Sequence, residues 1–156
     1  MAVKLSPAKP DDRYARLYFV FKDQNTIEAR TEDQSDENMG WIDFWSEDAR
    51  ACKEAIRRMA GRIYVLGERR EKRSKELTDE KALAELEEFN RLLVEGFAYR
   101  TKGWRLINSN GEPVDVPLTF ENAKEVYGDD DHNLRSVIQD FLKDRTNFPL
   151  RASGNS

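Results

Sequence analysis

The sequence contains a single cysteine, Cys52, and a single histidine, His132. One cysteine cannot form a disulfide within the chain, which argues against a small secreted scaffold and fits a reducing compartment. One histidine falls short of the ligand set of a typical zinc or iron site. Glycine-rich phosphate-binding loops of the GxxxxGK(S/T) and GxGxxG types are absent as well. The usual sequence signatures of metal-dependent and nucleotide-binding enzymes are therefore missing.

Long apolar runs and an excess of positive charge are also missing. No apolar segment approaches the roughly 18 residues that a membrane-spanning helix needs, and Met1–Pro10 lacks the apolar core of a signal peptide. Lys and Arg number 26 against 30 Asp and Glu, for a net charge of −4. A dedicated nucleic-acid binder usually carries a basic excess, because phosphate neutralisation supplies most of its affinity. We therefore expect a cytoplasmic protein whose partner is neither a membrane nor a nucleic acid.

The composition is that of a folded chain with a thin core. Charged residues make up 36% of the 156 residues and hydrophobic residues 38%, while an aromatic content of 10% argues against disorder. This length is typical of one domain. We predict an extended arm at residues 1–12, a single α+β domain at residues 13–148 and a disordered tail at residues 149–156.

The N-terminal third has the pattern of β-strands. Tyr14–Lys22 is dense in aromatic and β-branched residues and predicts a strand that is buried on much of both faces. Thr26–Thr31 alternates weakly and predicts a second short strand. Trp41–Trp45 alternates strongly, with its two tryptophans on one side and Ile42 and Phe44 on the other. It is interpreted as a strand or a strand-like lead-in to a helix.

Two amphipathic helices are predicted in the middle of the chain. Ser46 is an N-cap candidate for the first helix, and Thr78 for the second. Apolar residues recur at three- and four-residue spacing behind each cap. The first stripe consists of Ala49, Cys52, Ile56, Met59, Ile63 and Leu66, and the second of Leu83, Leu86, Leu93 and Phe97. The charged segment between them leaves two arrangements open, an antiparallel helical hairpin or one long broken helix.

The C-terminal third predicts a hairpin and two further helices. Asn110-Gly111 is a strong turn signal, because both residues tolerate positive φ, and it separates strand candidates at Trp104–Ile107 and Val114–Leu118. Thr119 caps a short helix, and a last helix is predicted over Asn133–Lys143. The expected fold is α+β, with a small antiparallel sheet of N-terminal strands and a C-terminal hairpin packed on three to four helices.

Three features invite a chemical interpretation. His132 follows three aspartates, which suggests a metal site or an acid–base pair, or else a polar loop at the N-terminus of the last helix. Cys52 is either a nucleophile or a small hydrophobe on its apolar stripe. Arg69–Lys75 is either a contact for nucleic acid or an acidic protein, or else a solvated helix end. Because none of these motifs assembles a catalytic pattern, we predict a non-enzyme with no catalytic residue, no metal and no cofactor.

The aromatic residues are the more informative feature. They crowd into the N-terminal third, where a strand that is apolar on both faces leaves an apolar surface unless both faces are covered. Such a surface marks a protein interface. We name as candidate protein-contact residues Trp41, Phe44, Trp45 and Trp104.

The segment Gly96–Phe148 contains a longer pattern. A GW pair opens a strand, NGEPV forms a turn, PLTFENAKEVY forms a capped helix, and an acidic turn leads into a final helix. This segment, about a third of the chain, resembles the C-terminal part of tail assembly chaperones and similar small tail-cluster proteins of long-tailed bacteriophages. The matching positions are Gly103, Trp104, Asn110, Gly111, Pro113, Val114, Pro117, Thr119, Glu121, Asn122, Tyr127, Ile138 and Phe141.

The resemblance implies a binding function without catalysis. Tail assembly chaperones bind the long, coiled tape-measure protein before the tail tube polymerises around it, shield its apolar helices and help to recruit tube subunits. The resemblance thus implies the phage tape-measure and tail proteins as partners and the host cytoplasm as the location. The alternative is a structural minor tail or neck subunit, which would be found in the virion. The oligomeric state is left open.

Overall fold

The computed structural model describes residues 11–34, 38–72 and 78–148. These residues form five antiparallel strands and four α-helices, which confirms the predicted α+β class. Most of the arm predicted at residues 1–12 and the whole tail predicted at 149–156 lie outside the described residues. Among the described residues, none of the helices combines the length and the apolar character needed to cross a lipid bilayer.

The strands form one sheet in the order β2-β1-β3-β4-β5. Their bounds are Tyr14–Phe21 for β1, Ile27–Arg30 for β2, Gly40–Trp45 for β3, Thr101–Ile107 for β4 and Pro113–Val114 for β5. The N-terminal strands and the C-terminal hairpin meet where β3 pairs with β4, with Ile42 opposite Trp104. Strand β4 begins three residues before the predicted Trp104, because Gly103 is itself paired with Asp43 in the ladder.

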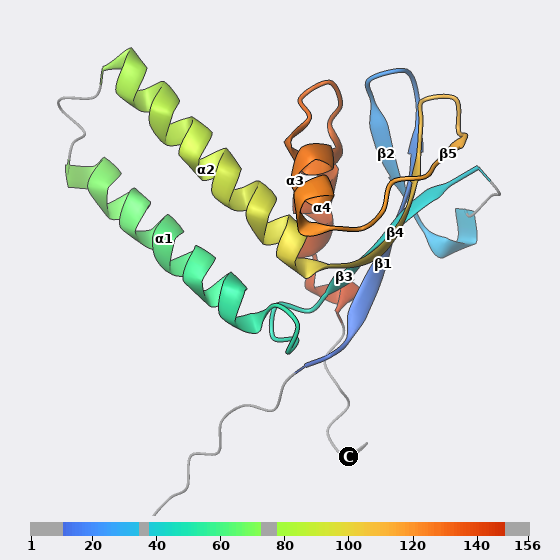
Figure 1. Cartoon of the computed structure of the whole chain (residues 1–156), viewed down its shortest axis with the longest axis horizontal. Helices are drawn as coiled ribbons and strands as arrows, with labels where there is room; N and C mark the ends of the chain where they lie inside the picture. The colour runs from blue at the N-terminus through green and yellow to red at the C-terminus, as the bar shows by residue number, and fades with distance from the viewer. Residues whose placement is uncertain (1–10, 35–37, 73–77, 149–156) are drawn as a thin grey trace, which may run out of the picture.

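The helices lie on one side of the sheet (Figure 1). Their bounds are Lys53–Lys72 for α1, Asp79–Arg100 for α2, Phe120–Gly128 for α3 and Leu134–Lys143 for α4, and short 3-10 turns occupy Glu32–Gln34 (η1) and Arg145–Asn147 (η2). Helices α3 and α4 lie next to the sheet, and α1 and α2 form an antiparallel hairpin that projects beyond them. The structure therefore has the hairpin, and not the long broken helix, of the two predicted alternatives.

Alternate residues of the two central strands enter the core beneath α3 and α4. Leu17 and Phe19 of β1 are buried, as are Ile42 and Phe44 of β3, and all four belong to one apolar cluster. The neighbouring residues in each strand point to the opposite face, as strand geometry requires. The alternation predicted for Trp41–Trp45 is confirmed, and it decides which side of the sheet the helices cover.

Two predicted helix caps are confirmed, and a third is wrong. The Thr78 and Thr119 hydroxyls accept from the backbone N–H of Lys81 and Asn122, as N-caps do. Ser46 does not cap α1, which begins seven residues later. Its N–H still donates to the Arg13 carbonyl at 2.8 Å, so the strand pairing of β1 and β3 continues to this residue. The turn that follows Ser46 keeps Ala49 and Cys52 buried before the helix starts.

Helix α2 passes directly into β4, because the helix ends at Arg100 and the strand begins at Thr101. The Thr101 hydroxyl donates to the Phe97 carbonyl at 2.8 Å and lies 2.6 Å from the Tyr127 hydroxyl. Since the single hydroxyl proton of Thr101 is directed at Phe97, Tyr127 must donate to Thr101 Oγ1. Burial raises the pKa of the Tyr127 phenol, which keeps it in the protonated form that donates.

The close approach of Phe19 to Gly40 gives a direct test of this packing. A Cβ added at Gly40 would overlap the Phe19 ring, whereas nothing lies within 4 Å of a Cβ added at Gly61 in α1. We expect Gly40→Ala to lower the free energy of unfolding by about 1–3 kcal/mol, the usual cost of overpacking. The matched Gly61→Ala change should raise it by about 0.5–1 kcal/mol through helix propensity. Urea unfolding measures the free energy of unfolding of both variants. Equal stability of the two would contradict the described packing.

Candidate functional site

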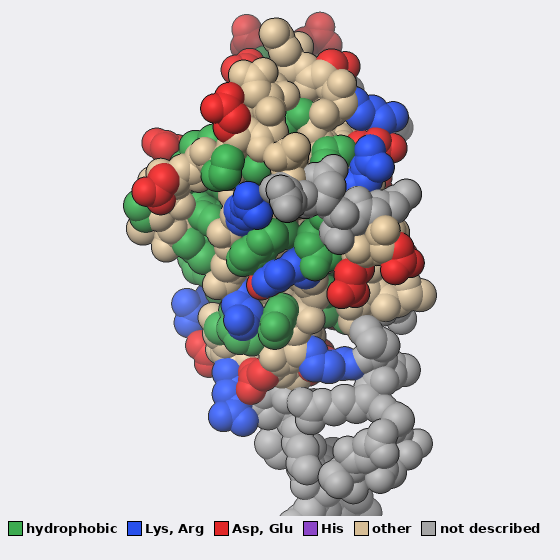
Figure 2. All heavy atoms as spheres, turned by 90° about the vertical axis from the view of Figure 1, so that its right-hand side faces the viewer, with side chains coloured by type: hydrophobic (Ala, Val, Ile, Leu, Met, Phe, Trp, Pro, Cys, Tyr) green, Lys and Arg blue, Asp and Glu red, His purple; other side chains and the backbone are tan. Residues whose placement is uncertain are grey.

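The face of the sheet that no described α-helix covers carries hydrophobic and basic side chains close together (Figure 2). Trp41 and Trp45 lie on it, half-buried, and Tyr14 is 51% exposed. The Arg16 guanidinium lies 3.8 Å from the centre of the Trp41 ring, and the Lys102 ammonium lies 4.4 Å from that of Tyr14. These cation–π contacts order the face and leave the ring edges accessible. The prediction that Trp41 and Trp45 are partner contacts is compatible with these positions and stays a prediction.

An ion pair crosses the middle of this face. Arg16 donates to both carboxylate oxygens of Asp43, at 2.7 and 3.0 Å, and Asp43 is only 4% exposed. The hydrogen bond to Asp43 is the main reason that the pKa of Arg16 is raised, so the guanidinium remains charged at any ordinary pH. Gly103 lies opposite Asp43 in the ladder and leaves the Trp41 ring room beside it. The two side chains thus neutralise each other and hold Trp41 in place.

Of the other two predicted contact residues, Phe44 belongs to the core and Trp104 is partly buried against it. Phe44 is fully buried, with its ring 6.4 Å from that of Tyr127 and 6.2 Å from that of Phe141. No partner can reach it, so its assignment as a contact residue is corrected. Trp104 packs edge-on against Tyr127, and its indole N–H donates to the Val116 carbonyl at 2.9 Å. Both rings lie on the helix-covered side of the sheet, where the strand alternation places them.

A second surface is an apolar groove of about 310 Å³ between α1, α2 and α4. It is lined mainly by apolar and small side chains, namely Ile56, Met59, Ala60 and Ile63 of α1, Leu92, Leu93, Gly96 and Phe97 of α2, and Leu142 of α4. Ala60 is exposed, and Gly96 has nothing within 4 Å of its Cβ position. These two small residues leave the groove open to solvent.

Exposed apolar side chains extend this groove along the hairpin. Tyr64 is 67% exposed and follows Ala60 by one helical turn. Leu86 is 52% exposed and precedes Leu93 by two turns on the same face of α2. Large apolar groups left in solvent on adjoining helices are typical of a surface that binds another apolar surface.

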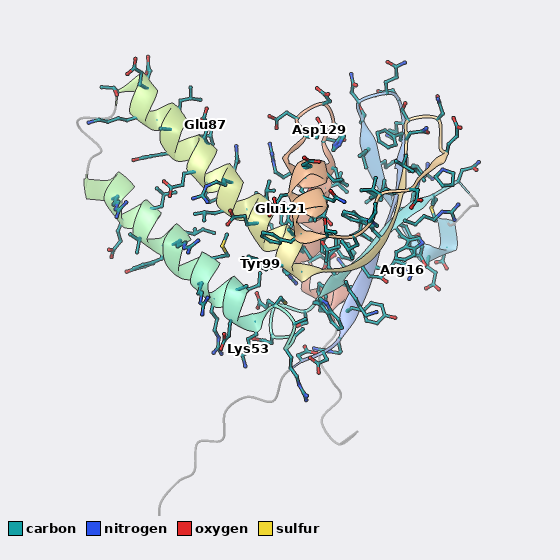
Figure 3. All side chains as sticks on the ribbon, in the orientation of Figure 1. Arg16, Lys53, Glu87, Tyr99, Glu121 and Asp129 are labelled. Atoms are coloured by element: carbon teal, nitrogen blue, oxygen red, sulfur yellow. The ribbon has the colours of Figure 1, made fainter. Side chains whose placement is uncertain are left out.

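The rim of the groove is positively charged. Arg100 and Lys143 line the groove, and Arg57 and Lys53 lie one and two turns before Ala60 along α1. Figure 3 places Lys53 on the first turn of α1, where the helix approaches the sheet. The α1 sequence has seven basic and three acidic residues, against a net charge of −4 for the chain. The basic cluster predicted at Arg69–Lys75 begins on this helix, and its residues 73–75 lie outside the described ranges.

His132 and Cys52 have structural surroundings. The Leu134 N–H donates to His132 Nδ1 at 3.3 Å, so the imidazole caps the first turn of α4 and its proton resides on Nε2, 3.7 Å from Asp129. Cys52 is 2% exposed, and its thiol donates to the Ser46 carbonyl at 3.4 Å. Burial raises the pKa of the Cys52 thiol, which disfavours the reactive thiolate. The described residues contain no cluster of His, Cys, Asp and Glu placed to hold a metal ion.

Comparisons of the chain with protein-family models, with curated proteins and with solved structures found no match. The assignment of a function therefore depends on the surfaces of the molecule itself. The apolar groove was not predicted from the sequence, because its walls come from three helices whose relative positions are set by the tertiary fold. Tyr64 is a local signal that could have indicated it, since it adds an apolar side chain beside the predicted stripe of the first helix.

The rate at which the Cys52 thiol reacts with a reagent tests whether this side chain is buried. We expect the native protein to react with a thiol reagent such as dithionitrobenzoate at least about 100-fold more slowly than the chain in concentrated guanidinium chloride. The reason is that the buried thiol must be exposed before it can ionise and react. Absorbance of the released product measures both rates in one protein. A native rate equal to that of the unfolded chain would show an accessible, reactive cysteine instead.

Proposed function

We propose that this protein is a non-catalytic assembly chaperone or adaptor of a long-tailed bacteriophage that binds an amphipathic helix of the tape-measure protein. The helix occupies the groove between α1, α2 and α4. The observation that carries the proposal is this open apolar groove with its basic rim. The similarity of Gly96–Phe148 to tail assembly chaperones supports the choice of partner.

The groove has the dimensions of a helix-binding site. From Leu92 to Arg100 the α2 wall spans about 12 Å at 1.5 Å per residue, which matches about two turns of a partner helix. Apolar side chains line both long walls, and this is the arrangement that accepts the apolar face of an amphipathic helix. A helix bound there would cover Tyr64 and Leu86, which are otherwise left in solvent.

The basic residues of the groove would select among amphipathic partner helices by their charge. Arg100 and Lys143 line the groove beside the apolar residues, so a partner helix with Glu or Asp beside its apolar stripe would be favoured over a basic one. Rim charges of this kind act mainly on the association rate and on the choice of partner.

A structural minor tail or neck subunit is the second candidate function. The observation that favours it is the uncovered sheet face, where Tyr14, Trp41 and Trp45 form an ordered aromatic surface. A permanent neighbour in an assembled particle would cover such a face. The two candidates differ in location, because a chaperone acts in the host cytoplasm and a subunit stays in the virion.

The groove is tested by placing a carboxylate on its α1 wall. We expect Ala60→Glu to weaken binding of a helical tape-measure segment at least about tenfold, which is about 1.4 kcal/mol, because the new charge lies on the apolar floor and repels an acidic partner. The control is Ala84→Glu on α2, which is an exposed alanine outside the groove and adds the same charge. Isothermal titration of purified variants against segments of the tape-measure protein from the same phage gives both affinities. Equal weakening by the two substitutions, or by neither, would exclude this groove as the site.

Mass spectrometry of purified virions separates the two candidates. The chaperone proposal expects this chain to be absent from particles while it co-purifies with the tape-measure protein from infected cells. A fixed copy number in the particle would overturn that proposal and establish the structural subunit.

A further inference from the structure

Strand β1 is paired on both sides only at Tyr18 and Phe19. Its pairing with β3 runs from Tyr14 to Phe19, whereas its pairing with β2 ends at the Tyr18–Arg30 pair. Beyond Arg30 the chain turns into η1 (Glu32–Gln34) and leaves the sheet. The edge of β1 at Tyr14–Leu17 therefore faces no other strand among the described residues.

The backbone groups directed at this edge can be identified from the register. The Arg13 carbonyl accepts from Ser46 beside β3, and the Lys22 N–H donates to Thr26 beside β2. Successive residues of a strand point their hydrogen-bonding groups to opposite sides, and neither register of β1 is interrupted. Odd-numbered residues of β1 thus bond to β3, and the N–H and C=O of Tyr14 and Arg16 point to the open edge.

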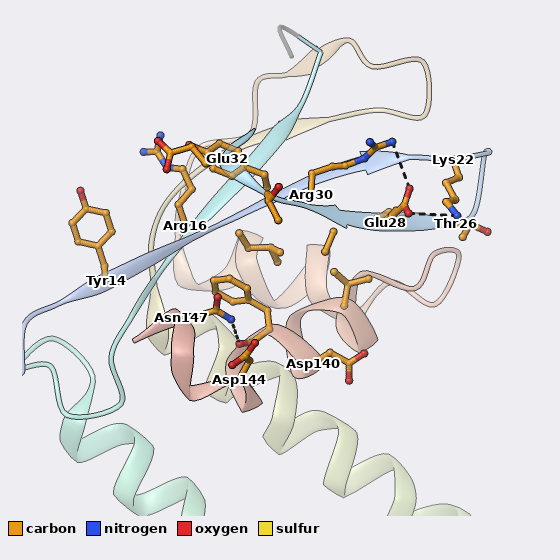
Figure 4. A pocket seen from close by; sticks show the side chains of 17 residues that line it. Tyr14, Arg16, Lys22, Thr26, Glu28, Arg30, Glu32, Asp140, Asp144 and Asn147 are labelled. Carbon is orange, nitrogen blue, oxygen red and sulfur yellow. Dashed lines mark hydrogen bonds and ion pairs between the residues drawn. The ribbon is translucent and has the colours of Figure 1, made fainter. Parts of the chain in front are cut away.

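A groove of about 960 Å³ follows this edge (Figure 4). Its apolar floor consists of Leu17 and Ile27 from the sheet and Val137 and Phe141 from α4. Figure 4 shows β1 and β2 passing over α4, with Asp140 on this helix and Asp144 directly after it, below the strands. The groove thus combines unpaired strand backbone with an apolar floor beside it, which are the two elements of a strand-addition site.

We propose that an extended segment of another protein binds in this groove as an added strand alongside Tyr14–Leu17, with an apolar side chain on the floor and Lys or Arg side chains beside Asp140 and Asp144. Backbone hydrogen bonds to Tyr14 and Arg16 would supply the affinity. The apolar floor and the two carboxylates would supply the specificity. This site lies on the sheet edge, apart from the helix-binding groove, and the proposal does not depend on what occupies that groove.

The charges around the groove favour a basic segment. Its cations are already engaged, since Arg16 is paired with Asp43 while Lys22 and Arg30 both lie 3.5 Å from Glu28. On α4, by contrast, neither Asp140 nor Asp144 has an ion-pair partner among the described side chains. A cation in the added segment would meet uncompensated carboxylates there.

A donor in the groove also lacks its acceptor. Arg30 Nε is buried and has no hydrogen-bond partner among the described atoms. Buried donors in native proteins are nearly always satisfied. Because Arg30 ends β2 next to the open edge, a carbonyl of the added strand is a suitable acceptor.

The length of the edge argues for a short segment and against a second copy of this chain. The open edge covers four residues, or about 13 Å at 3.3 Å per residue. Strand β1 of a second copy has eight residues and carries its own β2 on the same edge. Two copies paired edge to edge would therefore bring their β2 strands and η1 turns into the same space.

The probes are two acetylated and amidated heptapeptides, TKTLTKT and TETLTET, titrated into the full ¹⁵N-labelled protein. In an added strand the leucine and both charged residues point to the same side, toward the floor and α4. We expect TKTLTKT to bind at least about tenfold more tightly than TETLTET. The amides of Tyr14 and Arg16 should exchange freely in the unbound protein and become at least about tenfold slower with saturating TKTLTKT, whereas the Leu17 amide should be protected throughout.

Two pairs of variants separate the backbone contribution from the charge contribution. Tyr14→Pro removes one edge N–H and should weaken TKTLTKT at least about tenfold, whereas Tyr14→Ala keeps this N–H and should stay within about twofold. Asp140→Lys with Asp144→Lys should reverse the preference toward TETLTET. The control is Glu112→Lys with Asp115→Lys, two exposed acids on the β4–β5 side of the sheet, which should leave the preference unchanged. The amide spectrum of each variant verifies that it is folded.

Three results would overturn the proposal. Equal affinity for the two peptides would show that the carboxylates do not select a basic segment. Slow exchange of Tyr14 and Arg16 in the unbound monomer would show that this chain already covers its own edge. A doubled mass in solution, with the same two amides protected, would show that a second copy occupies it.

Discussion

The contact between Tyr127 and Thr101 sets the angle at which the helical hairpin leaves the sheet. Helix α2 continues into β4 without a loop, so the direction of the helix is fixed by the first residue of the strand. Thr101 is held on one side by the Phe97 carbonyl and on the other by a phenol that is fully buried. The rings of Phe44, Phe97 and Trp104 each lie 6.2–6.4 Å from that of Tyr127, in the range of favourable aromatic pairs.

The surfaces with which the protein can bind partners follow from this constraint. Because α2 is fixed at its C-terminal end and α1 packs on α2, the hairpin stands beside α4 and a groove remains between the three helices. All four helices lie on one side of the sheet, so its other face keeps Trp41 and Trp45 uncovered. The hairpin groove and the open β1 edge offer different geometries, one suited to a helix and the other to an extended segment.

Local signals in the sequence predicted most of the elements but not the site. The alternation of Trp41–Trp45 and the Thr78 and Thr119 caps depend on residues close in sequence, and the structure contains them. The hairpin at Asn110-Gly111 is also present, although only Gly111 has a positive φ. Ser46 was misassigned because a serine before acidic residues resembles a cap even where strand pairing continues through it. Phe44 was misassigned because the alternation separates two faces without telling which one the helices cover. The groove requires the relative placement of α1, α2 and α4, which no local pattern contains.

The most direct test of this account is the distance between α1 and α4, which determines whether the groove is preformed. Nitroxide labels at the exposed positions Arg62 and Ser136, on a Cys52→Ser background, allow the distance to be measured by double electron–electron resonance. The account predicts one narrow distance distribution that stays the same when a helical tape-measure segment is bound. A broad or two-peaked distribution in the free protein would contradict it, because the hairpin would then hinge at Thr101 and the groove would not exist before binding.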